Sequence, residues 1–127
     1  MTLAELYACC PPVDCEPGCT DCCGPVPFSR SEWERTGLPF SEAKQTPALP
    51  GAYLAGKGDS IETLVCLFRE PGGCSIYESR PFICRLYGCG PGLPCAKGRG
   101  PRFPLSATAM ALLAGTYQTI VREEAKC

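Results

Sequence analysis

Four of the chain's twelve cysteines stand within nine residues, in the segment CEPGCTDCC, and the last two of them are adjacent. The segment 15–25 is too rich in Cys, Gly and Pro to form a helix, because Pro lacks a backbone N–H and Gly weakens a helix. We therefore expect a loop whose backbone N–H groups point at sulfur. The sulfurs of such a loop can bind metal, form disulfides or remain as reactive thiols.

The rest of the composition narrows this choice. The start of the chain, MTLAELYACC, has neither the positive region nor the apolar region of a secretory signal, so we expect the cytosol. In a reducing cytosol a high cysteine density indicates metal more often than disulfides, although hyperthermophile proteins are an exception. The chain has no His, which excludes His ligands and His-based catalysis. Any metal would therefore be held mainly by thiolate.

Length and charge set further limits. A chain of 127 residues fits one domain, and we expect residues 1–127 to form a single cysteine-rich metal-binding unit. The net charge of −1 gives no basic face for nucleic acid, and no apolar run reaches the roughly 18 residues of a membrane helix. With 14 Gly and 14 Pro, we expect a small α+β fold that is irregular, loop-rich and stapled by metal.

The first half of the chain predicts short helices. TLAELYA can form one helical turn before CCPP ends it. Ser29 and Glu32 fit a capping box and Gly37 fits a helix stop, which predicts a helix at about 30–36. FSEAKQT predicts a further turn capped by Ser41.

The second half predicts a hairpin and two helices. AYLA and IETLVCLF are strand-like, GKGD supplies the turn between them, and EPGG is a second turn signal. SRPFICRLYG predicts a short helix with Ser79 as its cap and Gly88 at its end. Residues 89–104 are expected to be loop. The clearest helix is the C-terminal one, at about 105–125, whose core stripe is Leu105, Ala109, Leu112, Leu113, Tyr117, Ile120 and Val121.

The cysteine spacing predicts a metal site built from two halves. Gaps of two or three residues let one loop place two sulfurs on one ion, and distant cysteines then complete the shell. The loop would supply Cys15, Cys19, Cys22 and Cys23, while the hairpin and the helix would bring in Cys66, Cys74 and Cys84.

Seven thiolates exceed the four donors of a tetrahedral ion. Either two ions share bridging sulfurs, or one centre uses four cysteines and the others are structural. Cys22 and Cys23 are neighbours whose side chains diverge, so we expect them to serve different ions, or only one of them to bind. A disulfide framework is the alternative for all seven.

The segments CEPGCTDCC, PVPFSRSEW, CLF and CSIYESRPFICR together resemble the small family described as zinc- or iron-chelating domains, known for a C-x3-C-x2-C-C signature. The resemblance covers about residues 15–87, and Cys74–Arg85 is its most specific part. A similar cysteine motif occurs in flagellin lysine N-methylase, a larger protein for which an iron–sulfur cluster is implied. The resemblance implies the ligands Cys15, Cys19, Cys22, Cys23, Cys66, Cys74 and Cys84.

The remaining cysteines fall outside that pattern. Cys89 is a possible extra ligand. We expect the others to be free or disulfide-bonded rather than ligands: Cys9, Cys10, Cys95 and Cys127.

Three side chains near Cys84 are candidates for supporting the site. Arg80 and Arg85 can offset the negative charge of the thiolates, since guanidinium groups stay charged and donate several hydrogen bonds. Salt bridges to Glu70 or Glu78, or exposure to solvent, are the alternative for both arginines. Tyr77 can donate its hydroxyl to a thiolate, although packing in the core is the simpler role for a tyrosine.

Three classes of function remain. The first is a metal-binding protein that holds zinc or iron in a structural or metal-handling role. The second is an iron–sulfur protein with a redox or enzymatic role, for example one associated with methyl transfer. The third, a zinc-stapled nucleic-acid binder, is disfavoured by the charge balance. No catalytic triad, phosphate loop, dinucleotide fingerprint or carboxylate pair is visible, so we assign no catalytic residues and favour binding over catalysis. The protein partner is left open.

Overall fold

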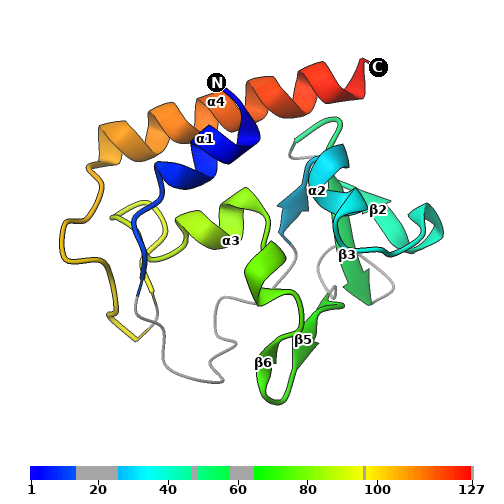
Figure 1. Cartoon of the computed structure of the whole chain (residues 1–127), viewed down its shortest axis with the longest axis horizontal. Helices are drawn as coiled ribbons and strands as arrows, with labels where there is room; N and C mark the ends of the chain where they lie inside the picture. The colour runs from blue at the N-terminus through cyan, green and yellow to red at the C-terminus, as the bar shows by residue number, and fades with distance from the viewer. Residues whose placement is uncertain (14–25, 47–48, 58–64, 96, 127) are drawn as a thin grey trace.

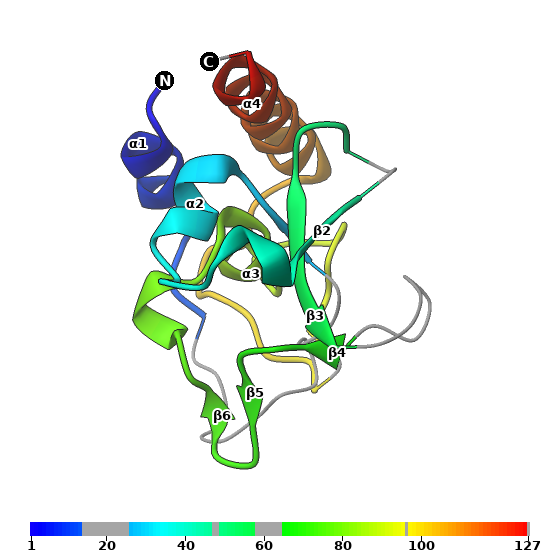
Figure 2. The ribbon, with the colours of Figure 1, turned by 90° about the vertical axis from the view of Figure 1, so that its right-hand side faces the viewer.

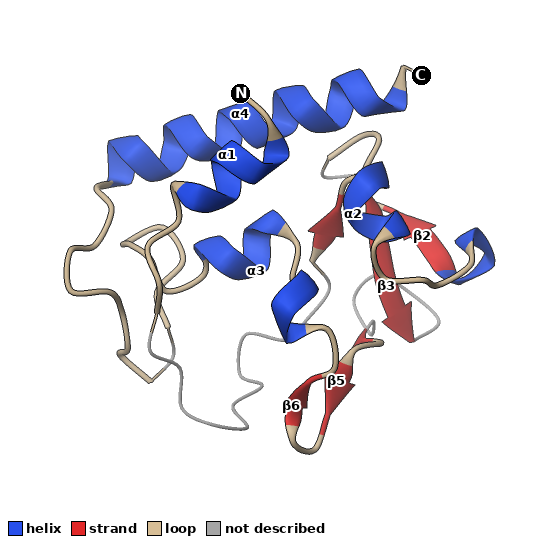
Figure 3. Ribbon diagram, in the orientation of Figure 1, coloured by secondary structure: helices blue, strands red, loops and turns tan. Residues whose placement is uncertain are grey.

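The computed structural model describes residues 1–13, 26–46, 49–57, 65–95 and 97–126. Three helices lie together on one side of these residues, and a small antiparallel sheet lies on the other with a short helix beside it (Figures 1 and 3). The long C-terminal helix lies across the top of the view in Figure 1 with the N-terminal helix beside it, and the sheet lies to the right.

Four α-helices are present in the described residues, and three of them begin at a capping side chain. Thr2 with Glu5, and Ser29 with Glu32, form complete capping boxes, and the Ser106 hydroxyl accepts from the backbone N–H of Ala109 at 3.1 Å. The helices are α1 (Leu3–Ala8), α2 (Arg30–Glu34), α3 (Phe82–Leu86) and α4 (Ala107–Ala125). The described residues also include two 3₁₀ turns: η1 (Phe40–Glu42), which follows α2, and η3 (Tyr77–Ser79), which precedes α3.

The sheet is organised around one central strand. Its strands are β1 (Pro27–Phe28), β2 (Ala43–Gln45), β3 (Tyr53–Lys57) and β4 (Val65–Cys66). β3 pairs antiparallel with the other three, and Leu54 lies opposite both Pro27 and Lys44. Near its end, Gly56 of β3 lies opposite Cys66 of β4. A separate hairpin, β5 (Arg69–Glu70) and β6 (Gly73–Cys74), follows β4 and extends away from α4 (Figure 2).

The apolar side chains form two cores rather than one. The helical core joins α1, α3 and α4, and the Phe82 and Tyr117 rings stack in it at 4.8 Å. The sheet core lies between the sheet, α2 and the β5–β6 hairpin. Its buried members are Phe28, Trp33, Ala55, Cys66 and Phe68.

The carboxylate of Glu32 connects the two cores. Its side chain is only 1 % exposed, although it sits on the short helix α2. It accepts hydrogen bonds from the Phe82 backbone N–H at 2.6 Å and from the Tyr117 hydroxyl at 2.5 Å. The Tyr7 hydroxyl also donates to it, and so does the backbone N–H of Ser29 at 2.9 Å. One buried anion therefore holds α1, α3 and α4 against α2.

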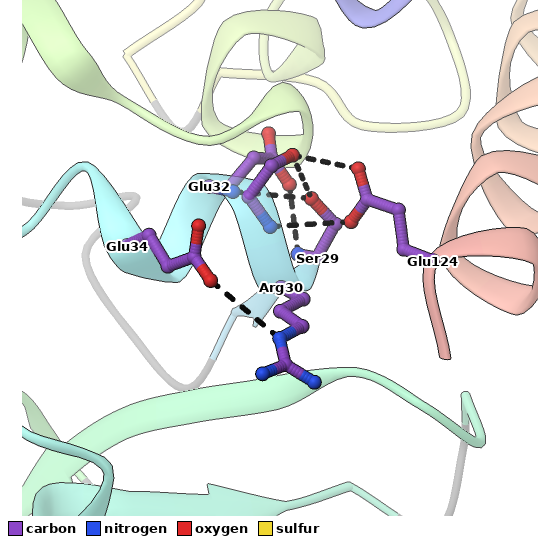
Figure 4. Close-up of polar contacts among 6 residues, drawn as sticks. Ser29, Arg30, Glu32, Glu34 and Glu124 are labelled. Carbon is purple, nitrogen blue, oxygen red and sulfur yellow. Dashed lines mark hydrogen bonds and ion pairs between the residues drawn. The ribbon is translucent and has the colours of Figure 1, made fainter. Parts of the chain in front are cut away.

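A second carboxylate anchors the end of α4 to the beginning of α2. Glu124 accepts from the Ser31 hydroxyl at 2.6 Å and from the Ser31 backbone N–H at 3.2 Å. Figure 4 shows Glu124 reaching from α4 toward the capping box of Ser29 and Glu32. Both carboxylates lie where the unpaired N–H groups of a helix start favour negative charge.

The predicted α+β architecture is confirmed in outline, with its few helices, short antiparallel sheet and C-terminal helix. The predicted turn at TLAELYA, the helix near 30–36 and the C-terminal helix all form. β3 and β4 pair as the predicted hairpin, and EPGG forms the turn between β5 and β6. The expectation that a metal ion cross-links the fold stays a prediction.

Several local predictions were wrong. FSEAKQT forms only the 3₁₀ turn η1, with Pro39 rather than Ser41 at the cap position, because its second half pairs with β3 as β2. Gly56 and Lys57 belong to β3 rather than to the turn after it, and Phe68 lies in a turn rather than a strand. Residues 58–64, which include part of the predicted second strand, lie outside the described residues.

Two predictions about helices were also wrong. α3 has Pro81 rather than Ser79 at its cap position and no capping side chain of its own, because Glu32 accepts its first N–H from a distance. Leu112 was placed in the core stripe of α4, yet it is 67 % exposed, and Met110 is buried on the helix instead.

Glu32→Gln should lower the free energy of unfolding by on the order of 3 kcal/mol, because three hydroxyl or N–H donors from other helices lose an anionic acceptor. Tyr117→Phe, which removes one donor, should cost about 1–3 kcal/mol. Glu34→Gln is the control, since Glu34 only pairs with Arg30 at 3.5 Å on the surface and should change stability by about 0–1 kcal/mol. Urea unfolding of the three variants measures this. Equal midpoints for Glu32→Gln and Glu34→Gln would show that the helices do not depend on the buried carboxylate.

Candidate metal centre

Cys66 is the last residue of β4, and Leu67 and Phe68 form a turn directly after it. The side chain is buried at 8 % exposure, and the chain behind it is fixed by the Leu67 N–H donating to the Ala55 carbonyl at 3.3 Å. Burial raises the pKa of the Cys66 thiol, and the nearby Cys74 raises it further, whereas the backbone N–H groups of Phe68 and Arg69 lower it. Hydrogen bonding from these two backbone groups therefore favours the thiolate form of Cys66 and opposes the effect of burial.

The β5–β6 hairpin returns the chain to the same place. Pro71 and Gly72 form its turn, Cys74 lies opposite Arg69, and the Ser75 N–H donates to the Phe68 carbonyl at 2.8 Å. Gly73 has φ 128°, a conformation that favours glycine over residues with a side chain. The result is that Cys74 packs against the sheet core that contains Cys66, and the charges of the two sulfurs influence each other.

This pair fits a thiolate metal site by its chemistry. Cys74 packs against the core that contains Cys66, and the backbone N–H groups of Phe68 and Arg69 favour the deprotonated form of Cys66. In the part of the chain that the structure describes, no three Cys, Asp or Glu side chains converge as a metal-binding group. The other predicted ligands of the loop lie outside the described residues: Cys15, Cys19, Cys22 and Cys23.

The remaining predicted cysteines lie on the helical side. Cys84 is half-buried in α3. Cys89 is fully buried in the helical core, where its single S–H has two acceptors in reach, the Pro11 carbonyl at 3.3 Å and the Arg85 carbonyl at 3.2 Å. The structure thus places Cys66 and Cys74 at the sheet core and Cys89 in the helical core.

Comparison with protein-family models gives one match, over residues 14–92, to the family CxxCxxCC, described as a "putative zinc- or iron-chelating domain". The match covers more than half of the chain. The chain belongs to the CxxCxxCC family. The match includes all seven predicted ligands and Cys89, and it leaves out Cys9, Cys10, Cys95 and Cys127. Searches of the curated proteins and of the solved structures found no match.

The resemblance inferred from the sequence is therefore confirmed, and a zinc- or iron-chelating character follows from the family. The CxxCxxCC match ends before α4, so that helix lies outside the family segment but still packs against α1 and α3. None of the helices in the described ranges is long and apolar enough to cross a membrane.

The arginines near Cys84 make contacts with the backbone and with aromatic rings. Arg85 donates to the Arg80 carbonyl at 2.8 Å and to the Glu78 carbonyl at 2.9 Å. Its guanidinium group lies 4.1 Å from the centre of the Tyr7 ring. Arg80 donates to the Tyr77 carbonyl at 2.8 Å and stacks on the exposed Tyr77 ring at 3.9 Å. Their predicted role of balancing thiolate charge, and that of Tyr77, stay predictions.

The cysteines outside the CxxCxxCC match form no disulfide where the structure describes them. Cys9, Cys10 and Cys95 carry free thiols, and Cys9 is the exposed one. Cys127 lies outside the described residues.

The groups that surround Cys66 and position Cys74 were not predicted from the sequence. Those groups are the N–H donors of Phe68 and Arg69 and the conformation of Gly73. The signal was the order Cys-Leu-Phe followed by Pro-Gly-Gly-Cys, in which two turns flank a strand of only two residues. Such a stretch forms a hairpin that returns one cysteine to the other.

Gly73→Ala should weaken metal binding without removing any sulfur, because a Cβ at φ 128° costs roughly 1–3 kcal/mol and displaces Cys74. Gly72→Ala is the matched control, since Gly72 lacks a positive φ and an added Cβ there meets no atom within 4 Å. Competition with a chromogenic chelator compares the two variants with wild type. Equal metal retention in both variants would show that this hairpin does not position a ligand.

Proposed function

We propose that this protein holds zinc or iron through cysteine thiolates, in a structural or metal-handling role. The observation that carries the proposal is the CxxCxxCC match over residues 14–92, within which Cys74 packs against the sheet core that contains Cys66. Hydrogen bonding from the backbone N–H groups of Phe68 and Arg69 favours the thiolate form of Cys66. Such N–H groups reduce the charge density of bound thiolates and fix their orientation. A bound zinc ion would supply structural cross-linking, and iron would add redox chemistry.

The proposed ligand set combines two segments of the chain. Cys66 and Cys74 form the half supported by the hairpin geometry. The loop cysteines provide the other half, with Cys84 of α3 as a further donor. The complete set is Cys15, Cys19, Cys22, Cys23, Cys66, Cys74 and Cys84. In this arrangement the metal links the N-terminal part of the chain to the sheet, so that binding adds to folding free energy.

A second candidate is an iron–sulfur cluster with a redox or enzymatic role. One property of the chain favours this cluster: its candidate ligands are all cysteines, and it contains no His. Cysteine thiolates are the usual ligands of such clusters. Hydrogen bonds to sulfur, like those from Phe68 and Arg69, are among the features that tune cluster potentials. Anaerobic purification separates the two candidates: visible charge-transfer bands indicate iron, and a colourless protein that contains zinc indicates the structural site.

Cys66→Ser and Cys74→Ser should each lower the metal content per chain, because each removes one of two neighbouring thiolates. Cys9→Ser is the control, since Cys9 is exposed and free and lies outside the family segment. Elemental analysis of the three variants, purified side by side, gives the stoichiometry. Mass spectrometry after brief alkylation, with and without a chelator, adds the ligand map: removal of the metal should raise the alkylation of Cys66 and Cys74, whereas Cys9 should react equally in both samples.

The opposite pattern would refute the ligand assignment. Unchanged metal content in Cys66→Ser and Cys74→Ser, or loss of metal in Cys9→Ser alone, would mean that the hairpin does not belong to the site. Absence of zinc and iron from protein purified anaerobically without chelators would refute the proposed function itself.

A further inference from the structure

A cavity of about 210 Å³ lies between the segment that follows α1 and the helix α3. Its walls include the side chains of Tyr7, Cys10, Arg80, Arg85 and Tyr87. None of the described candidate metal ligands, Cys66, Cys74 and Cys84, lines it. The cavity is therefore a feature separate from the cysteine pair of the hairpin.

Arg85 is held rigidly at this cavity. Two of its nitrogen atoms donate to the backbone carbonyls of Glu78 and Arg80, and the guanidinium plane lies against the Tyr7 ring. A guanidinium group fixed in this way loses little freedom when a ligand binds. Its Nη1 group makes no hydrogen bond to the residues that the structure describes.

Arg80 offers more free donors than Arg85. Toward the residues that the structure describes, only its Nε takes part in a hydrogen bond, to the Tyr77 carbonyl, and both terminal amino groups remain for a ligand. Within the described ranges the one ion pair found joins Arg30 and Glu34, so no carboxylate neutralises Arg80 or Arg85 there. Glu32, the acid that lies behind Tyr7, is already occupied by the donors of the helices.

The thiol of Cys10, which also lines the cavity, does not supply a negative charge that would neutralise the two arginines. Burial raises the pKa of the Cys10 thiol to about 12, with Cys89 and Cys9 adding to the rise, although Arg85 and Arg80 oppose it. Cys10 is thus a neutral thiol near pH 7. Arg80 and Arg85 line the same cavity as Cys10.

We propose that this cavity binds a small multivalent oxyanion, either phosphate or a di- or tricarboxylate, between Arg80 and Arg85. Guanidinium groups match such oxyanions because their planar N–H groups donate in pairs to oxygen atoms. The cavity has the volume of several water molecules at about 30 Å³ each, which admits an anion of this size. It is smaller than the roughly 300–1,000 Å³ of sites for larger organic ligands.

Titration calorimetry on the full chain as purified tests the proposal, with inorganic phosphate in one arm and citrate in the other, at constant ionic strength in chloride. Wild type should bind at least one of them saturably, and the tighter arm identifies the class of ligand. Arg80→Gln should weaken that binding by about tenfold or more, since charge-assisted hydrogen bonds are lost. Arg122→Gln, an exposed arginine in the last turn of α4, is the control and should bind like wild type.

The result that overturns the proposal is the absence of saturable binding in both arms, or equal affinity in Arg80→Gln and wild type.

Metal content is measured before and after each titration, because citrate and phosphate can also bind a metal ion. Cys66→Ser should lose metal and keep the anion affinity. If it loses the anion affinity together with the metal, the anion binds at the metal and the cavity proposal fails while the metal function stands. If anion binding persists in a protein that never contains metal, only the proposed metal function fails.

Discussion

The fold depends on a single buried carboxylate. Removing a carboxylate from water is costly unless hydrogen bonds replace the solvent, and Glu32 receives them from the backbone N–H of Phe82 and the hydroxyls of Tyr7 and Tyr117. The cost is met only when α1, α2, α3 and α4 all occupy their places, because each contributes a group. Burial and the Glu32 charge accordingly raise the pKa values of both tyrosines well above the ordinary range, so that their hydroxyls remain donors.

This network explains how a chain with short elements positions its cysteines. α2 carries Glu32 toward the helices and Trp33 toward the sheet core, where the Trp33 and Phe28 rings meet edge to face at 5.9 Å. The sheet core in turn contains Cys66 and supports Cys74. Each core is small, and the strands other than β3 have two or three residues. A thiolate-bound ion that joins segments far apart in the sequence would add the cross-link that such a fold lacks.

Local signals in the sequence predicted those parts of the structure that depend on neighbouring residues. The capping box of Ser29 and Glu32, the turn at EPGG and the C-terminal helix all follow from short-range spacing and were predicted correctly. The second role of Glu32 could not be predicted, because its partners Tyr7, Phe82 and Tyr117 are 25 to 85 residues away. The same reason applies to α3, whose first N–H is accepted by Glu32 and not by a local cap. For the site, the cysteine spacing correctly indicated the CxxCxxCC family, whereas the N–H groups directed at Cys66 required the fold of the hairpin.

X-ray absorption spectroscopy of the metal in anaerobically purified protein tests the central claim most directly, because it counts the atoms bound to the ion. For zinc, the account predicts a shell of four sulfur atoms at about 2.3 Å, since the chain contains no His and its family segment is rich in cysteine. For a cluster, it predicts sulfur around iron together with a second iron nearby. A shell made mainly of nitrogen or oxygen atoms, at about 2.0–2.2 Å, would contradict the assignment of thiolates as the ligands.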